Sequence, residues 1–188
     1  SFPTRRSSDL TVTNTGTVEI LGNLASVDSI LFDGSGQIDL GADISNSDSA
    51  AGFGITGSTL RLIGDHQIHS ETSVLLDEII TDTAGDHVLS ITAHDEVRID
   101  DNAGTQAMPL GGLDITSSSG SIRFLPQASS GDEATIHAVD LILDAATETE
   151  FNNASILSGT VTISTTDLQL SGTMETTNGG TVTLTHSG

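Results

Sequence analysis

Gly16-Thr17-Val18-Glu19-Ile20 carries the pattern that decides the fold: a small residue, then polar and aliphatic residues in strict alternation. Alternate side chains of a β-strand face opposite sides, so such a segment has one polar and one aliphatic face. Short alternating segments rich in Val, Ile and Thr favour strand over helix. Six further copies occupy residues 36–40, 58–62, 95–99, 120–124, 139–143 and 166–170.

The spacing of these copies predicts a solenoid. Their middle residues lie 20, 22, 37, 25, 19 and 27 residues apart, and internal periods of about 20–50 residues are typical of solenoids. One coil cannot bury its aliphatic face alone, so the next coil, about 4.8 Å along the axis, must cover it. We therefore predict an all-β parallel β-helix of about seven coils with a period of roughly 20–27 residues. A string of antiparallel β-sandwich modules is the alternative, but such modules need about 100 residues each.

The interval of 37 residues leaves one question open. It contains the aliphatic run Val74-Leu75-Leu76-Asp77-Glu78-Ile79-Ile80. The segment from 65 to 87 is therefore either an extra coil or a loop inserted into one coil.

The first ten residues need separate treatment. Ser1-Phe2-Pro3-Thr4-Arg5-Arg6-Ser7-Ser8-Asp9-Leu10 resembles the translation of a common sequencing adapter over its whole length. We therefore expect residues 1–10 to be non-native, with a basic N-terminal arm as the alternative. Residues 11–188 are expected to be a β-helix segment truncated at both ends, as part of a longer protein.

The composition suits a thin aliphatic stack. The chain has 188 residues, a net charge of −21, no Cys, no Trp and only 3% aromatic residues. Such acidity is also typical of disorder, but the period-two pattern opposes that interpretation. The negative charge repels nucleic acid and anionic lipid. The sequence contains no stretch of about 18 apolar residues, so no membrane-spanning segment is predicted. The absence of cysteine is compatible with secretion across a bacterial envelope.

Three arginines are the candidate binding residues. With residues 1–10 set aside, Arg61, Arg98 and Arg123 are the only basic residues other than histidine. They would bind an acidic glycan or a carboxylate, or else pair structurally with acids such as Asp39 and Asp100. We expect them in one outward column, with the fourteen flanking aliphatic residues pointing inward. The expected column is Glu19, Asp39, Arg61, Arg98, Arg123, Ile142 and Gln169.

The other polar clusters predict neither a cofactor nor a defined metal site. His66 and His69 lie beside Asp65 and Glu71, which are residue types that transition metals accept. Residues three apart in a strand face opposite ways, however, so one ion cannot take both histidines. The acidic residues at 77–86, 95–101 and 132–133 are compatible with adventitious calcium, but no known calcium-binding loop is present.

An enzymatic alternative rests on Arg98 with Asp100 and Asp101. A β-helix polysaccharide lyase or hydrolase would use paired carboxylates, or arginine with calcium, on one face. The chain has no Tyr or Trp to stack on sugar rings. We therefore expect a non-catalytic protein, with a carbohydrate-active β-helix enzyme as the alternative.

A resemblance to a known family supports the non-catalytic interpretation. Residues 85–125 combine glycine-led strands with the element Pro109-Leu110-Gly111-Gly112-Leu113-Asp114-Ile115-Thr116. This combination is similar to repeats of large bacterial β-strand-repeat exoproteins, the filamentous-haemagglutinin-like adhesins. The resemblance implies an extracellular or cell-surface shaft whose partners are a host or cell-surface glycan or protein and the neighbouring repeats of its own chain. The chain lacks the secretion domain and haemagglutination signature of that family.

Overall fold

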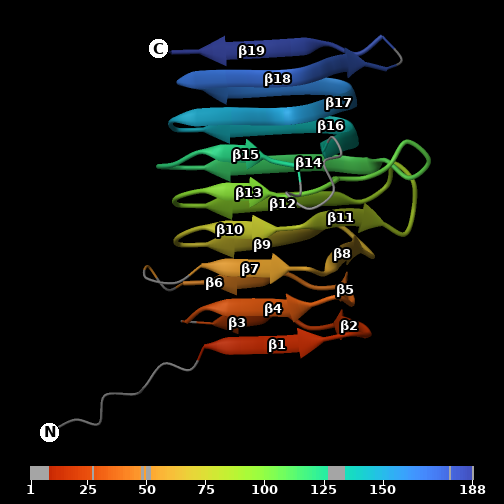
Figure 1. The fold of residues 1–188 in the computed structure, drawn as a ribbon, viewed down its shortest axis with the longest axis vertical. Helices are drawn as coiled ribbons and strands as arrows, with labels where there is room; N and C mark the ends of the chain where they lie inside the picture. Colours follow the sequence, from red (N-terminus) through yellow and green to blue (C-terminus); the bar gives the residue numbers. More distant parts are fainter. Residues whose placement is uncertain are drawn as a thin grey trace, which may run out of the picture.

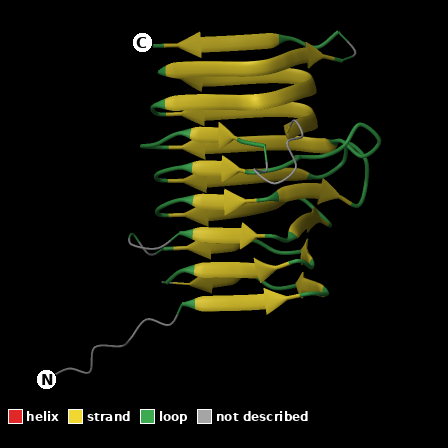
Figure 2. Cartoon of the chain, viewed as in Figure 1, coloured by secondary structure: helices red, strands yellow, loops and turns green. Residues whose placement is uncertain are grey.

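The computed structural model describes residues 9–26, 28–47, 49, 52–126, 134–177 and 179–187. Strands and turns account for the described residues, which contain no helix and hence no helix able to cross a membrane. The strands stack into one column of coils that runs from the N-terminal to the C-terminal end (Figures 1 and 2). The chain is a parallel β-solenoid of about 8 turns with a period of about 21 residues, which confirms the predicted fold class.

Each coil contributes to three faces, and strands of one face pair in parallel with their equivalents in the coils before and after. Face A comprises β1 (Leu10–Asn14), β4 (Ile30–Gly34), β7 (Phe53–Thr56), β10 (Val74–Leu76), β13 (Val97–Ile99), β15 (Ile122–Phe124), and the first residues of β17 (Glu148–Thr165) and β18 (Asp167–Thr176).

Face B begins with four short strands and continues through a single bridging residue, Ala103, which pairs with Ile79 and Ile136. It comprises β2 (Thr17–Ile20), β5 (Gln37–Leu40), β8 (Thr59–Leu62), β11 (Glu78–Thr81), the start of β16 (Ala134–Ala145), the middle of β17 and the end of β18. Face C comprises β3 (Leu24–Ser26), β6 (Ile44–Asn46), β9 (His66–Ser70), β12 (Val88–Ala93), β14 (Leu110–Ser117), the ends of β16 and β17, and β19 (Val182–His186).

The long interval of 37 residues contains an additional coil. The segment His66–Ser70 is β9 on face C, and Val74–Leu76 and Glu78–Thr81 are β10 and β11 on faces A and B of the next coil. The open question about residues 65–87 is therefore decided in favour of an extra coil, and the coil number rises from the expected seven to about 8.

The expected single outward column is wrong, because the seven copies fall on three different faces. Glu19, Asp39 and Arg61 follow one another on face B. Arg98 and Arg123 are paired neighbours on face A, where Glu150 and then Gln169 continue their column, and Ile142 lies on face C. The alternation of polar and aliphatic residues is the same on every face, so it cannot assign a strand to one of them.

The aliphatic core follows the predicted inward set closely. Eleven of the fourteen flanking residues are buried, and Val18 and Leu168 are half-buried against the core. Leu170 is 46% exposed, because β18 belongs to the last described coil. Two aromatic pairs add to the aliphatic stack: Phe124 lies parallel to Phe151 with ring centroids 5.1 Å apart, and Phe32 meets Phe53 edge-on at 6.3 Å.

Two expectations fall wholly or partly outside the described residues. Residues 1–8 of the expected non-native segment lie outside them, as do Asp132 and Glu133. Leu10 begins β1 and pairs with Ile30, so the expected boundary after residue 10 falls within a strand.

Candidate functional site

Arg61 forms an intramolecular ion pair with Asp39 on face B. Its Nε donates to Asp39 Oδ1 at 2.9 Å, and a terminal nitrogen donates to the other carboxylate oxygen. Asp39 is 3% exposed and also accepts a hydrogen bond from Gln37. The hydrogen bond to Asp39 raises the pKa of Arg61. Because Asp39 occupies the fork of the guanidinium, Arg61 neutralises a buried acid, as the structural interpretation predicts.

Arg123 is surrounded by carboxylates on face A. Its nitrogens lie 3.4 Å from Glu96, 3.1 Å from Glu148 and 3.3 Å from Glu150. Only the contact with Glu148 has hydrogen-bond geometry, and Nε lacks a hydrogen-bond partner, so its contact with Glu150 is electrostatic. The single positive charge of Arg123 thus lies among three carboxylates from the coils on either side. These carboxylates more than neutralise it, so Arg123 offers no net positive charge to a ligand.

Arg98 differs from the other two arginines. Its Nε donates to Asp100 Oδ1, a hydrogen bond that raises the pKa of Arg98. Among the described residues its terminal nitrogens have no partner, and its side chain is 43% exposed. Arg98 is therefore the arginine with donors to spare.

A groove of about 530 Å³ lies at the corner where face A turns into face B. Residues of several successive coils line it, because each face A strand ends at this corner. Apolar side chains form part of its lining, and charged and neutral polar groups form the remainder; the lining includes Leu75, Asp77, Arg98, Asp100, Leu125 and Pro126. We call this feature the Arg98 groove.

Asp77, which the sequence suggested only as part of an acidic cluster compatible with adventitious calcium, lies in the Arg98 groove with Arg98 and Asp100. It follows β10 as Asp100 follows β13, and Leu76 pairs with Ile99, so the two carboxylates occupy equivalent positions one coil apart. Burial raises the pKa of Asp77, and the negative charges of Asp100 and Asp101 add to this effect. The backbone N–H of Gly57, which donates to Asp77, and the Arg98 charge oppose it. Superposing the two coils in sequence would have shown this pair, but the sequence left open whether residues 65–87 form an extra coil or an inserted loop.

The histidines expected to lie on opposite sides of one strand contact different carboxylates. His66 lies 3.6 Å from Asp43, whereas His69 Nε2 lies 3.1 Å from Glu71. Within the described residues, no three His, Asp or Glu side chains come together in a way that could hold a metal ion.

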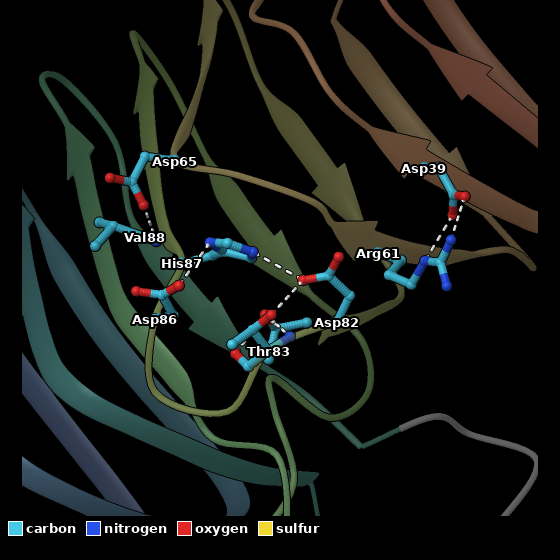
Figure 3. Close-up of polar contacts among 9 residues, drawn as sticks. Asp39, Arg61, Asp65, Asp82, Thr83, Asp86, His87 and Val88 are labelled. Atoms are coloured by element: carbon cyan, nitrogen blue, oxygen red, sulfur yellow. Dashed lines mark hydrogen bonds and ion pairs between the residues drawn. The ribbon is translucent and has the colours of Figure 1, made fainter.

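A second polar cluster fixes the connection between β11 and β12 (Figure 3). Asp82 accepts a hydrogen bond from the Thr83 hydroxyl at 3.0 Å and lies 2.8 Å from His87 Nε2. The hydrogen bond from Thr83 is the largest cause of the lowered pKa of Asp82, and His87 and Arg61 act in the same direction. Asp65 accepts a hydrogen bond from the backbone of Val88 at 2.9 Å. Asp65 thus holds the backbone at Val88, whereas Asp82 contacts the side chains of Thr83 and His87, and the two acids do not share a contact.

The Arg98 groove is thus the place where charged groups from neighbouring coils face an aliphatic surface. It could hold a sugar ring against Leu75 and Leu125 while Arg98 and the two aspartates contact hydroxyl groups. No protein-family model matches the chain, and no curated protein and no solved structure is significantly similar to it.

Proposed function

We propose that this chain is a non-catalytic shaft segment of a large, secreted or surface-attached bacterial exoprotein of the filamentous-haemagglutinin-like type. The continuous stack is the observation that carries this proposal. All three faces run through the whole described solenoid, and one aliphatic core connects its coils. Backbone hydrogen bonds between coils point along the axis, so bending or stretching the stack would strain many of them together.

The charge distribution supports the same proposal. Arg61 and Arg123 are neutralised within the chain, and the net charge of −21 keeps the surface acidic. A highly charged surface of one sign keeps extended proteins soluble and apart. A shaft of this kind would hold an adhesive element, specific for a glycan or a protein, away from the cell.

A rigid shaft predicts a fixed distance between its ends. Thr11 and Gln169 occupy the first and last positions of one outward column on face A, seven coil steps apart, so we expect about 34 Å between their Cα atoms. The chain has no native cysteine, so Thr11→Cys and Gln169→Cys can carry spin labels without background. Pulsed electron resonance on labelled chain diluted into unlabelled chain should give one narrow distance distribution. A broad distribution would contradict the shaft.

A second candidate function, carbohydrate cleavage, is favoured by the pair of aspartates in the Arg98 groove. Asp77, whose pKa is raised by burial, is the better candidate of the two for the general acid. Asp100, which is paired with Arg98, would act as the base or the nucleophile. Two carboxyl groups in unlike environments are the arrangement that glycoside hydrolysis requires.

The two candidates differ in a depolymerisation assay. The shaft proposal predicts no new reducing ends and no unsaturated products from xylan, alginate, polygalacturonate or hyaluronan. An enzyme would release them, and Asp77→Asn would lower the rate roughly 100-fold or more. Asp114→Asn, on the outer side of face C, is the matched control and should leave any cleavage unchanged. Cleavage that Asp77→Asn abolishes and Asp114→Asn does not would replace the shaft proposal.

A further inference from the structure

The Arg98 groove is elongated along the solenoid axis. Its lining begins with Thr56 in β7 and ends with Asn152 in β17. The intervening face A strands β10, β13 and β15 lie one above another (Figure 1), so the two ends of the lining are four coil steps apart. At about 4.8 Å for each step the groove is about 19 Å long. This shape suits a chain-like ligand that lies along the axis.

Two outward columns supply most of the lining. In the middle of face A, Leu75 is followed in the next coil by Arg98. At the corner, Asp77, Asp100 and Leu125 occupy equivalent positions in three successive coils, because the residues that precede them are paired. Apolar groups therefore lie on both sides of a charged centre: Leu75 one coil before Arg98, and Leu125 one coil after Asp100.

The charged centre offers hydrogen-bond donors and acceptors side by side. The terminal nitrogens of Arg98, which lack a partner among the described residues, can only donate. Asp100 uses one oxygen for Arg98, and Asp77 uses one for the backbone N–H of Gly57. Within the described part of the chain the second oxygen of each aspartate has no hydrogen-bond partner, and an ionised carboxylate can only accept. A ligand that satisfies both kinds of group must donate and accept at neighbouring atoms, as adjacent hydroxyl groups do.

Other classes of ligand satisfy the groove less completely. An anion would be repelled by Asp77 and Asp100 and by the net charge of −21. A cation would leave the donors of Arg98 unpaired. A peptide that adds as a strand needs an open sheet edge, but the face A strands along the groove are paired on both sides.

We infer that the Arg98 groove binds a neutral oligosaccharide that lies along the solenoid axis. The C–H faces of successive sugar rings would cover Leu75 and Leu125, and their hydroxyl groups would meet the charged centre between them. The groove volume of about 530 Å³ is within the range of about 300–1,000 Å³ that is typical of small-molecule sites. This inference adds a ligand to the proposed shaft and does not rest on it, because binding requires neither a rigid solenoid nor cleavage.

Isothermal titration calorimetry of the 188-residue chain tests the inference with cellohexaose, xylohexaose, mannohexaose and maltohexaose. We expect at least one of them to bind with a Kd of about 1 mM or tighter. Its affinity should be nearly the same at about 0.01 and about 1 M NaCl, because the ligand carries no charge. Hexagalacturonate, a chain of six acidic sugars, should bind at least about 10-fold more weakly. Failure of all four neutral sugars to bind, or tighter binding of hexagalacturonate, would overturn the inference.

Arg98→Met tests the charged centre, because it removes the free donors and keeps most of the aliphatic stem. We expect it to weaken binding of the neutral sugar at least about 10-fold. Arg123→Met is the matched control: Arg123 is the next residue of the same column but does not line the groove. It should bind like the parent chain. Equal losses for the two variants would contradict a site centred on Arg98. Circular dichroism establishes that each variant is folded.

The orientation of the sugar is tested at the two apolar ends. Leu75→Ser and Leu125→Ser should each weaken binding about 5-fold or more, because a ligand along the axis covers both leucines. Leu31→Ser is the control, since Leu31 precedes Leu75 by two coils in the same outward column and lies outside the groove lining. An effect of only one groove variant would overturn the axial orientation. Loss of binding in any of these tests leaves the spin-label distance unchanged, so the shaft proposal is tested separately.

Discussion

Phe151→Ala is expected to lower the free energy of unfolding by roughly 3–5 kcal/mol. Phe151 is completely buried and lies parallel to Phe124, with an angle of 4° between the rings. Loss of the ring removes this aromatic contact as well as the buried apolar area. The chain holds only 5 Phe and no Trp or Tyr, so the aliphatic neighbours offer no bulky side chain to fill the cavity.

Urea denaturation followed by circular dichroism measures this loss. Leu170→Ala is the matched control, because Leu170 pairs with Phe151 in the next coil but is 46% exposed. It should cost about 1 kcal/mol or less, since little buried area is lost. Similar losses for the two variants would show that the inward column is not what stabilises these coils.

Gly104→Ala is expected to cost about 3 kcal/mol or more. Gly104 has a φ of +72°, a conformation that costs a residue with a side chain roughly 1–3 kcal/mol. In addition, the new Cβ would overlap the carbonyl oxygen of His137. The segment cannot shift freely, because Gly104 N donates to Ile79 O at 2.8 Å and Ala103 N donates to Thr135 O at 2.9 Å. Between β11 and β16, these bonds, the Ala103 bridge and the hydrogen bonds that Thr135 donates to the Asn102 side chain connect face B across the described residues.

Gly85→Ala separates the two causes. Gly85 has a nearly identical φ of +71°, but its Cβ would meet only Val139 at an ordinary 3.5 Å. It should therefore show the backbone strain without the overlap and lose roughly 1–2 kcal/mol. Thermal denaturation gives both values. Equal losses would mean that face B adapts at residue 104, contrary to the expected rigidity of the bridge.

The sequence alone determined the local structure and the inward-facing side chains. Alternation in segments such as 36–40 dictates strand and separates an aliphatic face from a polar one, whatever the strand pairs with. Val, Ile and Leu at intervals near the coil length dictate stacking, because no single coil can bury them. The all-β class, the solenoid and eleven of the fourteen inward residues were predictable for this reason.

Only the tertiary structure decided which strands are neighbours. The turns between strands vary in length, and the strands of all three faces share one alternating pattern. Miscounting by one strand along the coil therefore assigns a residue to the wrong face. Arg61 was therefore placed with Arg98, although they lie on faces B and A, and the sequence left open whether the segment that contains β10 is a coil or an inserted loop. The Arg98 groove depends on this same information, since Asp77 and Asp100 are 23 residues apart in sequence and one coil apart in space. Alternation depends only on adjacent residues, and the sequence shows it directly. The meeting of Asp77 and Asp100 in the Arg98 groove depends on the combined length of all strands and turns between these two residues.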